Sequence, residues 1–285
     1  MRVTVFGASG LLGNALMREW AGDEVTGLRS KDAHIRDARQ VAKAVLDSRP
    51  DWIVLAAAYT DVDGCEKHPA LAFDINVQGA VNVADAANRS GVRLLFLSSD
   101  YVFDGSNSSP YETTDPRKPL NVYGRTKAEA EERLLEIIPN CCIVRTSWLF
   151  GRGGKCFPDT ILDLARTRTE IDVVNDQRGS PTYNTDLARA IIGLCRDGAT
   201  GIVHVTNAGH CTWYDFAKTI IDDEGLKTSV RPTTGENFAR PAARPKYSVL
   251  SPRSLQQHHI TMPSWQDALG RYLSQRKSQA LPLAR

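Results

Sequence analysis

The pair of residues best suited to chemistry is a tyrosine and a lysine four positions apart, Tyr123 and Lys127, in the segment NVYGRTK (121–127). At this spacing a helix presents both side chains on one face. A phenol can protonate a developing alkoxide, and an ammonium one turn away favours the phenolate and so lowers the pKa of the phenol. The same pair would also suit a tyrosine packed on the core beside a solvated lysine, so its role depends on the elements around it.

Two serines, Ser98 and Ser99, end the apolar segment VRLLFLSS (92–99) that precedes this pair. In a doubly wound sheet, ligands bind beyond the carboxyl ends of the strands, so both serines are expected in that crevice, with Ser98 beside a cofactor. A carbonyl reduction needs a hydride, which a nicotinamide supplies, and a proton. We therefore predict that Tyr123 donates the proton, Lys127 lowers the pKa of the phenol and Ser99 orients the carbonyl.

The elements that position these residues follow from the alternation of apolar and amphipathic segments. Continuous apolar segments predict buried parallel strands, and the amphipathic segments between them predict crossover helices. The expected strands are 2–6, 24–28, 51–58, 92–99 and 141–150, and the expected helices are 11–20, 38–49, 70–91 and 121–138. The fold class is therefore α/β, a doubly wound parallel sheet of the Rossmann type.

The pattern loosens after residue 151, which predicts a second, smaller α/β domain. Short strands with polar loops are expected within 171–182 and 201–209, and helices at 212–225 and 263–273. We assign 1–150 to a domain that binds NAD(P), and 151–285 mainly to a substrate domain that is interleaved with the first. The tail 274–285 is expected to be frayed.

A glycine-rich turn, GASGLLG (7–13), follows the first expected strand. Gly7 allows a tight turn, Gly10 lets the backbone approach a pyrophosphate, and Gly13 lets helix and strand pack closely. Glycines also mark ordinary turns, but here a strand precedes the motif and a helix follows it. We predict that a dinucleotide is bound by Gly7, Ser9, Gly10, Leu11, Leu12 and Gly13.

The residues after the second expected strand indicate which nicotinamide cofactor is bound. An acidic residue there would bind a ribose 2′-hydroxyl, whereas the sequence LRSKD has Arg29 and Ser30, which suit a 2′-phosphate. This favours NADPH, with NADH as the other possible cofactor. The alternative is that Arg29 is only a solvated loop residue.

Composition and charge argue against several classes of protein. Of the 285 residues, 42% are hydrophobic and 24% are charged, and the net charge of +2 comes without a basic run, so no nucleic-acid partner is expected. We find no apolar stretch long enough to cross a membrane and no secretory signal. The six cysteines lack the spacing of a zinc site, which indicates free thiols, no metal and a cytoplasmic location.

Many segments together resemble one family, the dTDP-4-dehydrorhamnose reductases of the extended short-chain dehydrogenase/reductase superfamily. The resemblance covers most of the chain and is carried, in the family's order, by FGASGLLG, AAAYTDVDGCE, SSDYVFDG, PLNVYGRTKAEAE, RTSWLFG, NDQRGSPT, TWYDFA, RPAARP and PSWQDAL. It implies NAD(P)H-dependent reduction of the C4 keto group of dTDP-4-dehydro-L-rhamnose to dTDP-L-rhamnose. It also implies a dTDP-sugar as the substrate, with a homodimer as one possible assembly.

The resemblance implies roles for further residues. Near the cofactor it implies His34, Ile35, Ala56, Ala57, Ala58 and Tyr59. Beside the substrate it implies Ser99, Asp100, Tyr101, Trp148 and Arg244, with Ser99 in the place of the family's usual threonine. Trp148 can instead be a core aromatic residue, and the arginines of RPAARP, Arg240 and Arg244, can instead belong to a solvated loop.

The sequence departs from the family in two places and leaves other functions open. His34 occupies the position of an acidic residue near the adenine, and Ala15 replaces a glutamate with which some members bridge a dimer through magnesium, so no metal is carried over. Sugar 4,6-dehydratases need a glutamate at the third position of the segment SDY (99–101), where this chain has Tyr101. Two alternatives remain: a nucleotide-sugar epimerase, and a non-catalytic regulatory subunit similar to the methionine adenosyltransferase β subunit.

Overall fold

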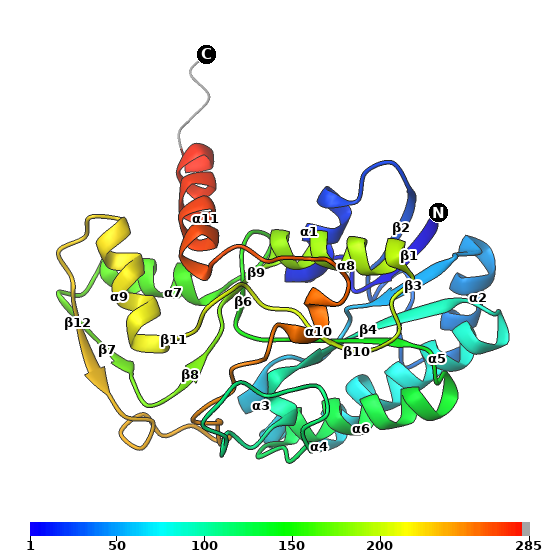
Figure 1. The fold of residues 1–285 in the computed structure, drawn as a ribbon, viewed down its shortest axis with the longest axis horizontal. Coiled ribbons are helices and arrows are strands. Elements are labelled where there is room, and N and C mark those ends of the chain that lie inside the picture. Colours follow the sequence, from blue (N-terminus) through cyan, green and yellow to red (C-terminus); the bar gives the residue numbers. More distant parts are fainter. Residues whose placement is uncertain (281–285) are drawn as a thin grey trace.

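Six parallel strands form the central sheet of the protein. The computed structural model describes residues 1–280, and the sheet within them has the order β10-β5-β4-β3-β1-β2 (Figure 1). Strand order runs outward from β1 in both directions, which confirms the predicted doubly wound parallel sheet. The strands are β1 (Arg2–Phe6), β2 (Glu24–Leu28), β3 (Trp52–Leu55), β4 (Arg93–Ser99), β5 (Cys142–Thr146) and β10 (Gly201–His204).

Helices cover both faces of this sheet. Strand β3 illustrates the reason, because Trp52 and Val54 are buried on one face while Ile53 and Leu55 are buried on the other. The first face is covered by α1 (Leu11–Glu19) and α8 (Asn184–Asp197). The second face is covered by α2 (Ala38–Ser48), α5 (Gly79–Arg89) and α6 (Val122–Ile137).

The helix expected at 70–91 is interrupted. It begins as α4 (Pro69–Phe73), which follows the short helix α3 (Val62–Lys67), and passes through a π-helical turn at 74–78 before α5. Within this turn the buried amide of Asn76 accepts a hydrogen bond from the Tyr59 N–H at 2.7 Å and donates to the Thr126 hydroxyl at 3.0 Å. A buried amide needs such partners, and the widened turn directs Asn76 toward them. Asn76 thereby joins the segment after β3 to α6.

The remaining elements form a smaller unit beside the sheet (Figure 1). Three pairs of short strands build it: β6 (Leu149–Phe150) with β9 (Thr182–Tyr183), β7 (Glu170–Val174) with β12 (Ser229–Thr233), and β8 (Arg178–Gly179) with β11 (Cys211–Thr212). Its helices, which share an aromatic-rich core, are α7 (Phe157–Ala165), α9 (Trp213–Asp223) and α11 (Trp265–Ala280). The short helix α10 (Arg253–Gln256) packs beside β10.

Several expectations for this half of the chain are wrong. The strand expected at 141–150 is two strands, because Trp148 adopts a φ of 44° and turns the chain out of the central sheet. Helix α11 continues to Ala280, so residues 274–280 are helical rather than frayed, and residues 281–285 lie outside the described part. Strand β10 and helix α8 return to the larger unit, so the chain beyond residue 150 contributes to both units, and the domain division at 150 stays a prediction.

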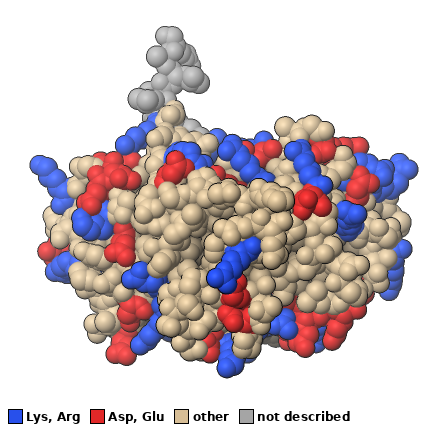
Figure 2. Space-filling view, in the orientation of Figure 1, with Lys and Arg blue, Asp and Glu red and all other residues tan. Residues whose placement is uncertain are grey.

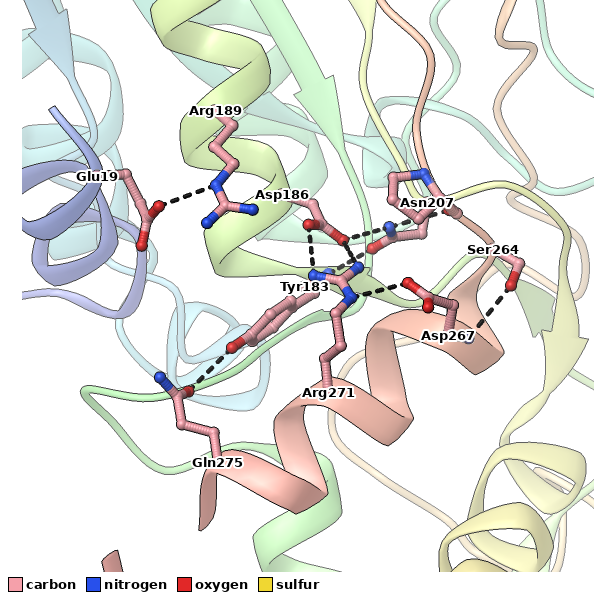
Figure 3. Close-up of polar contacts among 10 residues, drawn as sticks. Glu19, Tyr183, Asp186, Arg189, Asn207, Ser264, Asp267, Arg271 and Gln275 are labelled. Atoms are coloured by element: carbon pink, nitrogen blue, oxygen red, sulfur yellow. Dashed lines mark hydrogen bonds and ion pairs between the residues drawn. The ribbon is translucent and has the colours of Figure 1, made fainter. Parts of the chain in front are cut away.

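A polar cluster ties the C-terminal helix α11 to α8 (Figure 3). Arg271 on α11 donates two hydrogen bonds to the carboxylate of Asp186 on α8, at 2.9 and 2.6 Å. Asn207 donates to the same carboxylate at 2.8 Å and accepts from the Tyr183 N–H at 2.7 Å. Because the Asp186 side chain is only 4% exposed, these donors replace the water that the carboxylate loses. The cluster fixes the smaller unit against the larger one.

Asp186→Asn should therefore destabilise the protein. The substitution removes the buried one of the two carboxylates that Arg271 binds. Because Arg271 is 35% exposed and keeps its bond to Asp267, the loss should be about 2 kcal/mol, as for hydrogen bonds to a charged group. The free energy of unfolding from urea titrations measures this loss. Glu19→Gln is the control, because the Glu19–Arg189 pair (Figure 3) leaves Arg189 63% exposed and should contribute less than about 1 kcal/mol. Equal losses in the two variants would contradict the role given to Asp186.

The surface of the protein carries both signs of charge. Figure 2 shows Lys and Arg side chains interspersed with Asp and Glu across the face drawn, in keeping with the small net charge of +2. Among the described residues, no helix combines the length and the hydropathy needed to cross a membrane.

Candidate active site

Tyr123 lies in the first turn of α6, next to the segment that follows β4. Asn121 caps this helix, its side chain accepting a hydrogen bond from the Gly124 N–H at 2.8 Å. A Cβ at Gly124 would lie 2.1 Å from the Tyr101 carbonyl oxygen, so glycine allows the helix to approach. The rings of Tyr123 and Tyr101 then meet edge to face, with centroids 5.9 Å apart. Burial raises the pKa of Tyr123, and the nearby Ser99 hydroxyl opposes that rise.

Lys127 follows one turn later and is buried, with 2% of its surface exposed. Its ammonium lies 4.1 Å from the centre of the Phe96 ring. Burial lowers the pKa of Lys127 to about 7, and the negative charge of Glu131 opposes that shift. The alternative of a solvated lysine is therefore wrong, whereas the catalytic role of the pair stays a prediction.

The two serines at the end of β4 point to opposite sides of the sheet. The Ser99 hydroxyl donates to the Asp100 carboxylate at 3.0 Å and accepts from the Tyr101 N–H at 3.2 Å, on the side of Tyr123. The Ser98 hydroxyl instead donates to the buried carboxylate of Glu131 on α6. Because successive residues of a strand alternate, the Ser98 side chain does not share the crevice with that of Ser99, and the place of Ser98 beside the cofactor stays a prediction.

Asp100, predicted to lie beside the substrate, is a buried acid with 2% of its surface exposed. One oxygen accepts from Ser99, and the other has no hydrogen-bond partner among the described residues. Burial raises the pKa of Asp100 to about 7, and the hydrogen bond from the Ser99 hydroxyl opposes the rise. Asp100 therefore keeps its proton at pH values where an exposed aspartate has lost it.

Because the pKa of Asp100 is raised, its contribution to the free energy of unfolding should depend on pH. In the unfolded chain Asp100 has a pKa near 3.8, so folding favours the protonated form, and the stability that this provides is lost as the pH rises from 3.8 through about 7. Asp100→Asn should be nearly neutral at pH 4 and stabilising by about 4 kcal/mol at pH 8. Denaturant titrations at both pH values measure this difference.

Asp104→Asn is the matched control for this prediction. Hydrogen bonds from Ser106 lower the pKa of Asp104, so its contribution to stability changes below pH 4 rather than between pH 4 and pH 8. A pH-independent effect of Asp100→Asn, like that expected for the control, would contradict the raised pKa.

The glycine turn between β1 and α1 has the shape of a phosphate cradle. Gly7 has a φ of 92°, and a Cβ there would lie 2.6 Å from the backbone nitrogen of Ala57. A Cβ at Gly13 would lie 2.1 Å from the Gly7 carbonyl oxygen, so this glycine lets α1 pack against the turn. At Gly10, the first residue before α1, the nearest atom to a Cβ is 3.3 Å away. The open backbone at this helix N-terminus fits a pyrophosphate.

The other predicted cofactor residues lie around this turn with different degrees of exposure. Leu12 and Ile35 have core side chains, so only their backbones can face a ligand. Arg29 is 52% exposed, and its Nε donates to Asp32 at 2.9 Å, so it is held beside β2 rather than freely solvated. Ser9 and Ser30 are exposed, while the partly exposed residues are Leu11, His34, Ala56, Ala57, Ala58 and Tyr59.

A pocket of about 590 Å³ opens beside Tyr101, and both units line it. Its walls come from α7, β7, α9 and the segment 235–246. The segments NDQRGSPT and RPAARP, both among those that carry the family resemblance, contribute Asp176, Gln177, Arg240 and Arg244. Since Tyr101 contacts Tyr123, the pocket ends close to the predicted proton donor.

Trp148 packs against a residue that lines this pocket. Its ring stacks on that of Trp213 with centroids 3.5 Å apart and planes inclined by 8°, and Trp213 lines the pocket. A Cβ at Gly179 would lie 2.5 Å from Trp148, so glycine makes room for the indole. Trp148 thus packs with the core of the smaller unit, and its contact with a sugar stays a prediction.

Arg244 forms an ion pair with a residue of this chain that the sequence did not reveal. Its guanidinium forms two hydrogen bonds of 2.9 Å with the carboxylate of Asp63 on α3, and its side chain is 13% exposed, so the alternative of a solvated loop arginine is wrong for it. Arg240 lies 3.8 Å from the same carboxylate and is 50% exposed. Of the two arginines on the pocket, Arg240 therefore offers more of its guanidinium to an anion.

Sequence reasoning missed several residues of this site. Asp63, Phe157, Trp213 and Phe238 all lie on the pocket or brace it. The motif TWYDFA contains Trp213 and predicts a helix, but nothing in a helical pattern says which side chain faces a ligand. The pairing of Asp63 with Arg244 joins residues 181 positions apart, and no local spacing predicts it.

Known proteins resemble this chain in both sequence and structure. The spore coat polysaccharide biosynthesis protein SpsK of Bacillus subtilis is 42% identical over 279 residues, covering 97% of this chain and 98% of SpsK. A dTDP-4-keto-6-deoxy-D-glucose reductase of Streptomyces niveus is 37% identical and covers 99% of this chain and 97% of its own. The crystal structure of a dTDP-4-dehydrorhamnose reductase from Bacillus anthracis, in complex with NADP, has a TM-score of 0.94 at 39% identity, covering 96% of this chain and 99% of that one.

A family model agrees with these likenesses over nearly the whole chain. The RmlD substrate binding domain matches residues 1–278. This match and the identities to the relatives confirm the resemblance that the motifs indicated. The chain therefore belongs to the RmlD substrate binding domain family, that of the dTDP-4-dehydrorhamnose reductases.

Proposed function

We propose that this protein reduces the C4 keto group of dTDP-4-dehydro-L-rhamnose with NADPH to give dTDP-L-rhamnose. The observation that carries the proposal is that Tyr123 and the buried Lys127 lie one turn apart on α6, where Tyr123 meets Tyr101 at the edge of the pocket. The names of the reductase relatives and the NADP of the Bacillus anthracis structure support both substrate class and cofactor. A cytoplasmic location and a homodimer belong to the same proposal and stay predictions.

Bound NADPH supplies the hydride that C4 accepts. The Ser99 hydroxyl orients the carbonyl oxygen, and the Tyr123 hydroxyl gives that oxygen a proton as negative charge develops on it. Burial disfavours a Tyr123 phenolate and a Lys127 ammonium when each is considered alone. In a site of low dielectric the two charges stabilise each other, so Lys127 makes the loss of the Tyr123 proton easier.

The pocket beside Tyr101 takes the nucleotide part of the substrate. Arg240, with half of its side chain exposed, faces the diphosphate, while Arg244 acts through its bond to Asp63 to hold the segment 240–244 against α3. Trp213 and Phe238 offer apolar surface to the rest of the nucleotide. This arrangement leaves the keto sugar at the Tyr101 end, where Tyr123 lies.

A second substrate, dTDP-4-keto-6-deoxy-D-glucose, is favoured by one specific observation. The Streptomyces niveus relative carries the name of a reductase of that sugar at 37% identity. Hydride delivery to either face of C4 requires the same proton donor, so Ser99, Tyr123 and Lys127 suit both reactions. The stereochemistry at C4 depends on how the pocket turns the sugar, and the product has to be identified directly.

The proposal is tested by mixing the purified protein with NADPH and enzymatically prepared dTDP-4-dehydro-L-rhamnose and following the absorbance of reduced nicotinamide. We expect oxidation that depends on the sugar, with dTDP-L-rhamnose as the product in NMR spectra. The same assay with dTDP-4-keto-6-deoxy-D-glucose compares the two substrates. Bound NADPH without turnover of either sugar would contradict a reductase. Turnover without net NADPH consumption would favour an epimerase, and a copurifying synthetase would favour the regulatory role.

A further inference from the structure

A buried cluster lies behind the predicted catalytic residues and joins three elements of the larger unit. Glu131 on α6, one turn after Lys127, has no exposed surface. Its carboxylate accepts hydrogen bonds from Arg145 Nε at 2.9 Å and Nη2 at 2.6 Å, and a further one from the Ser98 hydroxyl. Ser98 on β4 and Arg145 on β5 are direct neighbours in the sheet. One carboxylate therefore holds α6 against the carboxyl ends of two adjacent strands.

The net stability of such a pair does not explain its presence. The cost of removing two charges from water largely offsets their attraction, and apolar side chains of similar volume would often stabilise as well or better. What the pair adds is a defined geometry, because four hydrogen bonds meet on one carboxylate, the fourth a longer one from Arg117 at 3.4 Å. Arg145 is itself fixed from behind, lying 5.1 Å from the Phe103 ring centre and 3.4 Å from the His204 ring nitrogen.

The cluster lies on the same helix and the same strand as the predicted catalytic residues. Tyr123 and Lys127 lie on α6, two turns and one turn before Glu131, while Ser99 follows Ser98 directly on β4. Any slide of α6 along the sheet would change the distance between Ser99 and Tyr123, and the bonds of Glu131 oppose such a slide. We propose that Glu131 is a positioning residue for the reduction, which through Ser98 and Arg145 keeps Tyr123 and Lys127 in register with Ser99. This inference rests on the proposed function.

Glu131 also acts on Lys127 through its negative charge, which raises the pKa of Lys127. Burial alone lowers the pKa of Lys127, and Glu131 is the charged group that opposes this shift. The carboxylate therefore helps Lys127 to stay an ammonium, even though Arg145 shares its charge. The titratable and charged groups on the elements around this part of α6 are Glu66 on α3, Asp100 and Tyr101 after β4, Arg117 in the following loop, Tyr123, Glu131 and Arg145.

The first test removes one donor without changing any charge. In Ser98→Ala, kcat for NADPH oxidation should fall on the order of tenfold, because small misplacements of reacting groups are costly, while the Kd for NADPH stays within about twofold. Ser98→Thr keeps the hydroxyl and should restore most of the lost turnover. Thr4→Val is the matched control, since Thr4 is also a fully buried strand residue whose hydroxyl donates to a helix residue, Ser48, at 2.9 Å.

The outcomes of this test separate positioning from a general loss of packing. A fall in kcat in Ser98→Ala that Ser98→Thr repairs and Thr4→Val does not reproduce supports the inference. Equal kcat values in Ser98→Ala and Thr4→Val would overturn it.

The second test does not depend on turnover. The pKa of Lys127 is measured by NMR of the ligand-free protein with 13C-labelled lysine, and Lys127→Met identifies the signal. In Glu131→Gln the pKa of Lys127 should fall, because the amide no longer opposes the effect of burial. An unchanged Lys127 signal would overturn the inference. If Glu131→Gln does not fold, the same signal is compared between the wild type and Ser98→Ala, where it should move.

Failure of the inference is distinguishable from failure of the proposed function. A wild-type protein that leaves the keto sugar unreduced contradicts the proposed function and with it the role of Glu131 in the reduction, and the Lys127 signal then shows only whether Glu131 raises the pKa of Lys127. A wild-type protein that reduces the sugar, with Ser98→Ala and Glu131→Gln as active as the wild type, contradicts only the inference.

Discussion

Tyr123→Phe is expected to lower kcat on the order of a thousandfold while the Kd for NADPH stays within about twofold of the wild-type value. Phenylalanine keeps the ring that meets Tyr101 edge to face, so the packing at the start of α6 survives. It removes the hydroxyl, and with it the proton that the developing alkoxide needs. The measurements are kcat from the absorbance of reduced nicotinamide and Kd from the fluorescence of bound NADPH.

Tyr111→Phe provides the matched control for this substitution. Tyr111 is also buried, its ring stacks on Phe103, and its hydroxyl donates to Asp104 at 2.9 Å, away from Ser99 and Lys127. Its loss should cost stability and leave kcat close to that of the wild type. Retention of most of the turnover in Tyr123→Phe would show that another group protonates the product.

Gly10→Val is expected to weaken NADPH binding on the order of a hundredfold, a loss of about 2.7 kcal/mol, while the protein stays folded. A Cβ at Gly10 would lie 3.3 Å from the Gly7 carbonyl oxygen, a tight contact that a shift of a few tenths of an ångström relieves. The added side chain stands at the N-terminus of α1, where the backbone must approach the pyrophosphate. Titration of NADPH fluorescence gives the affinity, and circular dichroism verifies the fold.

Two other glycines separate this effect from a general sensitivity to added volume. Gly13→Val should fail to fold, because its Cβ would lie 2.1 Å from the Gly7 carbonyl oxygen. Gly270→Val, in α11 with open space around it, should bind NADPH as the wild type does. Unchanged NADPH affinity in Gly10→Val would mean that the pyrophosphate lies elsewhere.

The parts of the fold that could be predicted from the sequence are those that local pattern governs. The apolar segments at 2–6 and 92–99 form the strands β1 and β4, because a sheet covered on both faces leaves little choice of residues. The helix that carries Tyr123 and Lys127 was also predictable, from its capping asparagine and helical period. The glycines of the cradle are recognisable because their conformation and close contacts exclude other residues.

The parts that could not be predicted depend on contacts between distant segments. The positive φ of Trp148, which splits the strand expected at 141–150, allows the indole to stack on Trp213. The π-helical turn that interrupts the helix expected at 70–91 is tied to the hydrogen bonds of Asn76 with Tyr59. The partner of Ser98 lies on α6 and becomes evident only when helix and strand are packed together.

The most direct test of the central claim follows the hydride itself. The wild-type protein is given dTDP-4-dehydro-L-rhamnose and NADPH that carries deuterium at both C4 positions of the nicotinamide, and the sugar product is examined by NMR. A reductase of the kind proposed places one deuterium at C4 of the hexose and leaves every other position unlabelled. A dTDP-hexose product without deuterium at C4, or with the label at another carbon, would contradict the proposed reaction.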